Sequence, residues 1–282
     1  MFPILLLLLA MLSFQAGASI AKTLFPVVGA IGMVTVRILL GTAILSVCFR
    51  PWRARIAPRA RGALLVYGAS LGLMNLCFYL ALSRIPLGIA VALEFAGPLA
   101  VAVSGSRRAA DLCWAALATG GLLLLLPIGH LHGGLDVLGI LYALAAGACW
   151  ALYIIFGKKA GASHGAQSVA LGSLISCMII APLGIARAGS ALLSRSILLP
   201  GLAVAILSTA LPYTLEMMAL TRIPARTYGI LMSGEPALGA LLGLLYLNER
   251  LSGLQWLAIG CVIAASIGTS LTAQQEKVPL PG

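Results

Sequence analysis

The stretch IPLGIAVALEFAGPLAVAV at residues 85–103 decides the fold of this chain. It contains one charged residue, Glu94, within an apolar run that approaches the roughly 20 helical residues needed to cross a bilayer. Other long uncharged runs occur along the chain, for example at residues 4–21 and 198–215. Runs of this length predict helices that span a membrane rather than the core helices of a soluble domain.

The composition of the whole chain agrees with this prediction. Of its 282 residues, 61% are hydrophobic and 9% are charged, and the mean hydropathy is +1.08. Soluble domains carry a charge at about a quarter of their positions and cannot bury this much apolar surface. We therefore expect an all-α polytopic membrane protein.

Apolar runs separated by Gly, Pro and charged residues predict ten transmembrane helices. Their expected bounds are 3–21, 28–49, 62–82, 87–106, 110–128, 135–156, 166–186, 198–220, 226–247 and 253–272. The first run resembles the apolar part of a signal peptide, but no basic segment precedes it and nine more spans follow. We expect it to remain as the first helix.

The basic residues punctuate the spans, so the net charge of +11 does not indicate a nucleic-acid-binding face. The densest cluster, at residues 50–61, is typical of a cytoplasmic loop; binding to anionic lipid or nucleic acid is the weaker alternative. With a cytoplasmic N-terminus, the inner loops and tail hold twelve Lys and Arg residues and the outer loops hold five. The positive-inside rule therefore predicts that both termini are cytoplasmic.

The chain repeats itself. LSRIP at residues 82–86 returns as LTRIP at 220–224, a shift of 138 residues that also places Pro98 on Pro236. At a shift of 136, Phe14 falls on Trp150 and Lys22 falls on Lys158. Five helices per unit make the second copy enter the membrane from the opposite side. We predict two inverted repeats, at residues 1–128 and 135–272, and a short cytoplasmic tail at 273–282.

Four charged residues lie away from the ends of the predicted spans, where each costs roughly 3 kcal/mol unless it has a partner, a cavity or a proton. They are Arg37, Glu94, Glu216 and Glu235. Under the repeat, Glu235 falls on Gly97, and Glu94 lies one turn from that position on the same helical face of the partner repeat. Each acid is close to a proline that removes a backbone hydrogen bond. An acid beside a broken helix is typical of a midplane substrate or ion site. Alternatively, the acids are protonated and hydrogen-bond neighbouring helices. Arg37 could instead be a structural counter-charge, or its side chain could extend to the membrane surface.

Polar and aromatic residues on the spans complete the candidate substrate- or proton-binding set. They are Gln15, Asn75, Tyr79, Trp150, Tyr153 and Tyr213. The amides could instead hydrogen-bond neighbouring helices, and the aromatic residues of the sixth span could instead anchor it at the membrane surface.

Enzyme and metal motifs find no support in the sequence. Gly68, Ser70 and Gly72 match GxSxG, but they belong to an apolar helix and the three histidines fall in predicted loops. The six cysteines lie inside apolar runs without a CxxC pair, and no Walker A, HExxH or GxGxxG motif occurs. We expect no enzyme activity, no cofactor and no metal site.

Four segments carry a resemblance to a known family. They are residues 16–22 (AGASIAK), 85–103, 147–154 (GACWALYI) and 202–241, which include the EFAGP and LMSGEPA motifs. With RIP at the start of helices 4 and 9, the chain resembles the drug/metabolite transporter superfamily and its EamA-type repeat. The four segments look closely like the threonine/homoserine exporters of bacterial inner membranes, whose basic tail before helix 1 is absent from this sequence.

The resemblance implies efflux of homoserine, threonine and similar amino acids driven by the proton motive force, with alternating access to a central cavity. Helices 1, 3, 4, 6, 8 and 9 would line that cavity. On this chain the implied lining is Gln15, Asn75, Glu94, Trp150, Tyr213 and Glu235. The implied partners are the amino acid, protons and membrane lipid but no nucleic acid, and pairing of two copies stays open.

Two rival functions stay open at this point. The same fold could export another metabolite or a cationic drug, which intramembrane acids also suit. A membrane sensor that binds a ligand without moving it is the rival of another class. The ten residues after Thr272 offer such a sensor no signalling domain.

Overall fold

Every element that the computed structural model describes is a helix. The described residues are 2–54, 56, 58–104, 109–125, 136–164, 167–220 and 231–272. The α-helices are α1 (Phe2–Thr23), α2 (Phe25–Phe49), α3 (Arg61–Leu82), α4 (Leu87–Glu94), α5 (Ala96–Ser104), α6 (Ala109–Leu125), α7 (Val137–His164), α8 (Gln167–Ala188), α9 (Arg195–Ala205), α10 (Leu211–Leu220), α12 (Glu235–Leu247) and α13 (Gly253–Thr272). Short helical turns are η1 (Pro51–Arg53), η2 (Pro58–Ala60), η3 (Gly189–Leu193) and η4 (Ile206–Ala210).

Many of these helices are long and apolar enough to cross a membrane. Within the described residues, six segments meet that requirement by length and composition, and four shorter apolar helices accompany them. The six segments are Ile4–Thr23, Phe25–Phe49, Pro58–Leu82, Val137–Gly157, Gln167–Leu193 and Arg195–Leu215. The all-α polytopic membrane fold is therefore confirmed, whereas the ten-span inverted repeat and the orientation of the termini stay predictions.

Several predicted helices differ from the described ones. The predicted span 87–106 is divided at Phe95 into α4 and α5, because Pro98 has no N–H to donate to the Glu94 carbonyl. In the predicted span 226–247, α12 begins at Glu235 with a proline in its first turn, and residues 221–230 lie outside the described part. The helix predicted to end at 156 continues as α7 to His164, so the placement of that histidine in a loop was wrong.

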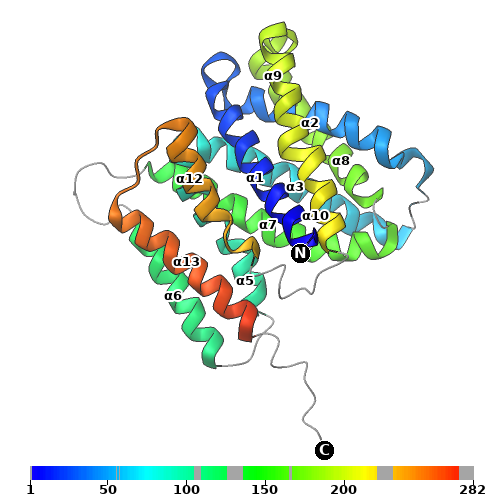
Figure 1. The fold of residues 1–282 in the computed structure, drawn as a ribbon. Helices are drawn as coiled ribbons and strands as arrows, with labels where there is room; N and C mark the ends of the chain where they lie inside the picture. The colour runs from blue at the N-terminus through cyan, green and yellow to red at the C-terminus, as the bar shows by residue number, and fades with distance from the viewer. Residues whose placement is uncertain are drawn as a thin grey trace, which may run out of the picture.

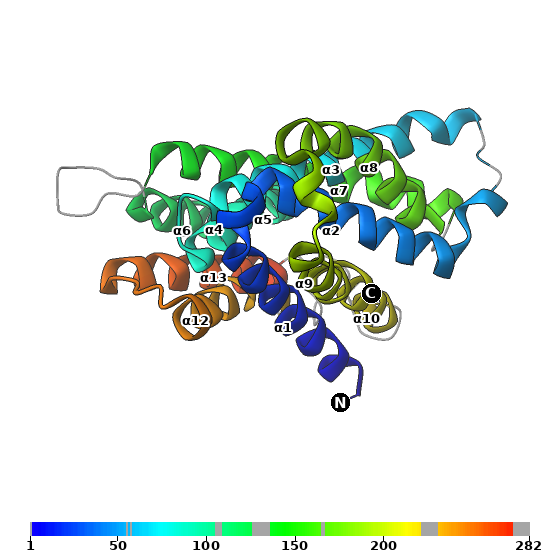
Figure 2. The same cartoon turned by 90° about the horizontal axis from the view of Figure 1, so that it is seen from above.

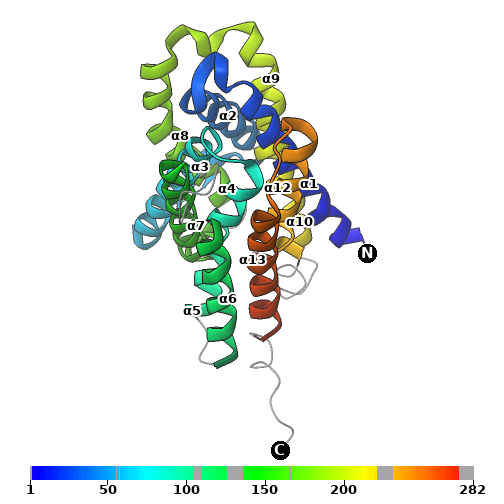
Figure 3. The same ribbon diagram turned by 90° about the vertical axis from the view of Figure 1, so that its left-hand side faces the viewer.

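The helices form two groups that face each other. Viewed from above, α3, α7 and α8 lie along one side of the molecule, and α1, α10 and α12 lie along the other (Figures 1 and 2). All eight residues of α4 are buried between them, where α4 packs against α7 and α12. Figure 3 shows α6 and α13 running side by side away from these groups. The helix that carries Glu94 therefore lies at the centre of the molecule.

A π-helical turn, η4, interrupts the segment between α9 and α10. A π-turn frees carbonyl groups from their usual helical partners, and such groups must be satisfied internally where no water is present. The Ser13 hydroxyl donates to the Leu207 carbonyl at 2.7 Å, and the Arg37 guanidinium donates to the Ser208 carbonyl at 2.7 Å. Side chains of α1 and α2 therefore stabilise this irregular turn.

The central helices touch backbone to backbone at two glycines. Gly97 of α5 lies against the carbonyl of Gly147 in α7, and Gly147 lies against the Glu94 carbonyl, which a β-carbon at position 147 would approach to 2.6 Å. Real β-carbons essentially never approach a neighbour so closely. Glycine at these positions lets α7 pack directly on the break between α4 and α5.

We predict that Gly147→Ala destabilises the protein by about 1–3 kcal/mol, the usual effect of overpacking a tight contact. The thermal unfolding midpoint in detergent should fall relative to the wild type. Gly120→Ala is the matched control, because a β-carbon there meets nothing within 4 Å. Equal midpoints for the two variants would contradict the described contact.

Candidate functional site

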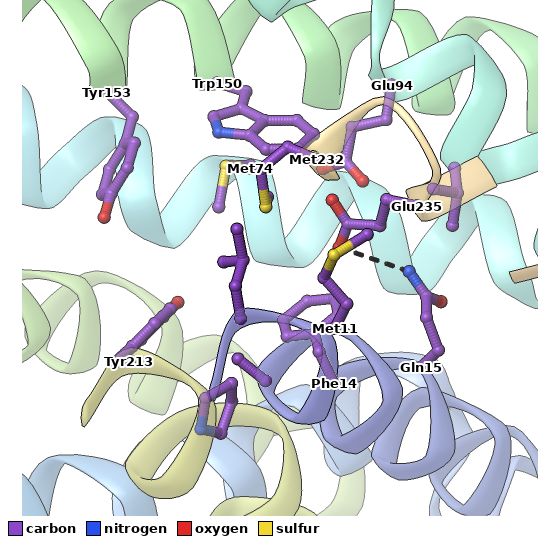
Figure 4. Close-up of a pocket in the computed structure, with 14 residues that line it drawn as sticks. Met11, Phe14, Gln15, Met74, Glu94, Trp150, Tyr153, Tyr213, Met232 and Glu235 are labelled. Carbon is purple, nitrogen blue, oxygen red and sulfur yellow. Dashed lines mark hydrogen bonds between the residues drawn. The ribbon is translucent and has the colours of Figure 1, made fainter. Parts of the chain in front are cut away.

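A cavity of about 80 Å³ lies between the two groups of helices, several times the space that one water molecule needs. Side chains from α1, α3, α4, α7, α10 and α12 meet there, together with residue 232, which precedes α12 (Figure 4). The lining residues are Leu7, Ala10, Met11, Phe14, Gln15, Met74, Val91, Glu94, Trp150, Tyr153, Pro212, Tyr213, Met232 and Glu235. The cavity combines an apolar surface with a small number of polar groups, which is typical of a small-molecule site.

Two carboxyl groups from the two halves of the chain meet in this cavity. Glu94 is the last residue of α4 and is 7% exposed, and Glu235 is the first residue of α12 and is 6% exposed. Their carboxyl groups point toward each other (Figure 4). The Gln15 amide of α1 donates a long hydrogen bond of 3.4 Å to Glu235. Both acids therefore lie at helix breaks, as the sequence predicts.

Aromatic side chains of α7 form the opposite wall. The Trp150 ring meets the Phe95 ring edge-on, with centroids 5.7 Å apart, and the Tyr153 ring stacks on Tyr67 at 5.0 Å. Trp150 thus packs at the break between α4 and α5, and Tyr153 packs against α3. Cavity lining describes the placement of Trp150 and Tyr153 better than anchoring at the membrane surface does.

The structure brings together six of the ten predicted site residues in this cavity: Gln15, Glu94, Trp150, Tyr153, Tyr213 and Glu235. Arg37 and Asn75 instead line a second, smaller cavity, which also includes Tyr213. Tyr79 is fully buried against Phe25, Phe78 and Arg37 and lines neither cavity. The side chain of Glu216 lies outside the described part of the structure, although its backbone belongs to α10. The roles of all ten residues stay predictions.

Sequence reasoning missed the apolar part of the lining, because it searched for polar residues. Leu7, Met11, Phe14 and Gln15 follow one another on α1 at helical spacing, so they share a face. That spacing could have identified the face of α1 that lines the cavity. Met74 and Met232 come from distant helices, and their spacing offers no such signal.

A second missed feature is a junction at the C-terminal end of α1. Lys22 pairs with Glu249 at 2.6 Å and donates to the Ile85 carbonyl at 2.9 Å, and both side chains are mostly buried. The other carboxylate oxygen of Glu249 accepts a hydrogen bond of 2.7 Å from the Leu87 backbone N–H. We call Lys22, Glu249 and the backbone of residues 85–87 the terminal junction. It joins the start of α4 to the ends of α1 and α12.

The donor set does not indicate a metal site. Within the described residues, no group of three or more His, Cys, Asp or Glu side chains could hold a metal ion. The two carboxyl groups and the amide of the cavity can hydrogen-bond a solute, and the carboxyl groups can also attract a cation or exchange a proton.

Comparisons with known proteins reveal close relatives. Residues 137–271 match the EamA-like transporter family. The threonine/homoserine exporter RhtA of Escherichia coli (strain K12) is 56% identical over 275 residues, which are 98% of this chain and 93% of that protein. RhtA of Salmonella typhimurium (strain SL1344) is 57% identical over 274 residues, which are 97% of this chain and 93% of that protein.

A solved structure supports the fold over the full length. A crystal structure of a protein 19% identical in sequence superposes with a TM-score of 0.65, covering 98% of this chain and 99% of that chain. At this identity the likeness concerns the fold alone.

We predict that the cavity admits water, whereas the core beside it does not. Ala10 and Ala18 are both buried on α1, but Ala10 lines the cavity and Ala18 belongs to the main hydrophobic core. In a background without the six natural cysteines, Ala10→Cys should react with a small water-soluble thiol reagent far faster than Ala18→Cys. Equal labelling rates would contradict the described cavity.

Proposed function

The chain belongs to the EamA-like transporter family, and on that premise we propose that it exports small amino acids, threonine and homoserine among them, in exchange for protons. It is a multi-pass protein of the bacterial inner membrane. The names of its relatives support the cargo, since the 56% identity to an exporter of threonine and homoserine extends along nearly the whole chain.

The meeting of Glu94 and Glu235 in one cavity is the observation that carries this proposal. A carboxylate attracts the ammonium group of an amino acid, and a carboxyl group can also take up a proton. Two adjacent carboxyl groups in an apolar interior cannot both stay charged without a partner, so cation and proton compete for them. Through this competition, release of the amino acid would be coupled to uptake of a proton.

The exchange can drive export. A single positive charge that enters through a potential of 100 mV supplies about 2.3 kcal/mol. Since each 1.36 kcal/mol corresponds to a tenfold ratio, this supports an outward gradient of roughly fiftyfold. A zwitterion carries no net charge, so the whole potential acts on the proton.

Alternating access requires that the cavity close at one membrane face when it opens at the other. The terminal junction supports such closure, because Lys22 lies at the opposite end of α1 from Leu7 and Ala10, which line the cavity. Under the predicted topology the junction lies at the outer face. The described conformation would then be closed to the outside.

The repeat supplies a counterpart of this ion pair at the other face. At a shift of 138 residues Glu249 falls on Asp111, and at 136 residues Lys22 falls on Lys158. The predicted topology puts both Asp111 and Lys158 at the cytoplasmic face. Exchange of the two repeats' conformations would break one ion pair and form the other, as inverted repeats allow.

Everted membrane vesicles test the proposed function. Energised vesicles that contain the protein should accumulate labelled homoserine and threonine, and an uncoupler should abolish the accumulation. Vesicles without the protein are the control. No accumulation of either amino acid would overturn the cargo and favour another metabolite or a cationic drug.

We predict that Glu94→Gln and Glu235→Gln each abolish proton-driven accumulation, because each removes a carboxyl group that binds the proton or the ammonium group. Protein level in the membrane, measured by immunoblot, should be unchanged. Asp136→Asn is the matched control, since this exposed acid lies outside the cavity and pairs with Arg84 at 2.7 Å. Full accumulation in both Gln variants would contradict the assignment.

We also predict that Lys22→Glu and Glu249→Lys each open the outer face, because a closed state that loses its ion pair is less populated. The reporter is Ala10→Cys, labelled from outside by an impermeant thiol reagent. Each single reversal should increase labelling above the wild-type rate. The double variant, in which both charges are reversed, should be labelled at a rate between those of the single variants and the wild type. The Glu249 hydrogen bond to the Leu87 backbone stays lost in the double variant.

Arg84→Ala serves as the control for the terminal junction. Arg84 forms an exposed ion pair with Asp136, beside Ile85 of the junction, and exposed pairs contribute only about 0–1 kcal/mol. Its hydrogen bond holds the pKa of Asp136 below the usual range of a carboxyl group. Labelling that rises in Arg84→Ala as much as in Lys22→Glu would assign the effect to general loosening.

A further inference from the structure

A buried arginine beside the cavity has no acidic partner among the described side chains. Arg37 lies in the middle of α2 and is 1% exposed. It donates to the Thr209 hydroxyl at 3.1 Å and to the Ser208 carbonyl at 2.7 Å, and both acceptors are neutral. The rings of Phe14 and Tyr79 lie 5.2 Å and 5.4 Å from the guanidinium carbon. The guanidinium is therefore contacted directly by dipoles and ring faces, and among the described side chains no carboxylate is paired with it.

The guanidinium borders the second cavity, which has a volume of about 20 Å³. This is close to the space that one water molecule needs, so a larger group enters only when the surrounding side chains move. Its polar lining consists of Arg37, Thr42, Asn75, Ser173, Ser176, Thr209 and Tyr213. Ser176 is 1% exposed, and its hydroxyl has no hydrogen-bond partner in the described structure. The cavity thus offers a cation and an unused hydroxyl group to a small polar occupant.

Two side chains link this cavity with the larger one. Phe14 lines the larger cavity and also lies against the Arg37 guanidinium. Tyr213 lines both cavities, and Figure 4 shows it directed into the larger one. Rotation of these rings would join an acidic chamber to a basic one. The two chambers together would match a molecule that carries an ammonium group and a carboxylate group close together.

We propose that the second cavity is the subsite for the substrate's carboxylate, with the Arg37 guanidinium as its counter-ion and the Ser176 hydroxyl as a further donor. The subsite rests on the proposed amino-acid export. Glu94 and Glu235 receive the ammonium group in the larger cavity, and the carboxylate enters past Phe14 and Tyr213. Arginine suits this role because its planar fork binds a carboxylate with two parallel hydrogen bonds.

The subsite explains why a cation is buried so close to two acids. A carrier of cationic solutes gains nothing from an arginine beside its cavity, since like charges repel. A carrier of zwitterions needs both signs, because each charged group of its substrate loses water on entry. The chemical class that fits is therefore the α-amino acid with a free carboxylate, and amino alcohols of the same size should bind poorly.

Competition by matched analogues tests the subsite in intact vesicles. Threonine and threoninol differ only in that a carboxylate is replaced by a CH₂OH group. In the wild-type protein, threonine should inhibit the uptake of labelled homoserine at about tenfold lower concentration than threoninol, since a hydrogen bond to a charged group typically gives this ratio. The ratio of inhibitory concentrations does not depend on the amount of protein.

Variants of Arg37 test whether the second cavity is responsible for the ratio between the inhibitory concentrations of threoninol and threonine. Arg37→Gln should bring the ratio close to one, and Arg37→Lys should keep part of it, because lysine retains the charge without the fork. Thr35→Val is the matched control: Thr35 is a buried polar residue of the same helix that lines neither cavity, and its ratio should stay at the wild-type value.

The outcomes separate the two proposals. If wild-type vesicles accumulate no amino acid, the proposed function fails and the subsite fails with it. If they do accumulate amino acid, a wild-type ratio near one overturns the subsite alone. The subsite is also overturned if the Arg37→Gln protein transports homoserine and keeps the wild-type ratio of inhibitory concentrations.

Discussion

Two carboxyl groups in the apolar centre of a helical membrane protein are the constraint on which the rest of the structure depends. Glu94 and Glu235 come from opposite halves of the chain and lie in one cavity at less than a tenth of their full exposure. A charged group at this depth needs a cavity, a partner or a proton. The cavity and the amide of Gln15 supply the first two in the described conformation. In our account, a proton bound by one of the carboxyl groups couples the site to the proton gradient.

The backbone is irregular where these groups lie. Helix α4 ends at Glu94, α12 begins at Glu235, and the π-turn η4 lies between α9 and α10. Irregular backbone at membrane depth is tolerated only where protein or a cavity satisfies its polar groups. Ser13 and Arg37 satisfy η4, and Gly97 and Gly147 allow α7 to pack directly on the break beside Glu94. The irregular segments are therefore the places where helices from both halves meet.

Much of this could be predicted from the sequence, because a membrane span is a local pattern. Hydropathy predicts the spans, and Pro98 and Pro236 predict the breaks beside the two acids. The Lys22–Glu249 pair and the packing of Arg37 against Phe14 could not be predicted in this way. Those contacts join residues that are distant in the sequence, and no periodicity encodes which distant side chains meet. His164, which was predicted in a loop, follows a segment without proline that continues as helix α7.

The central claim is that amino acid and proton move in opposite directions through one site. Reconstitution of the purified protein into liposomes tests it most directly, with a pH-sensitive dye inside and a homoserine gradient as the sole driving force. The account predicts that homoserine leaving the liposomes brings protons in, so that the interior acidifies with the wild-type protein and not with Glu94→Gln. Homoserine efflux without any change of internal pH would contradict it.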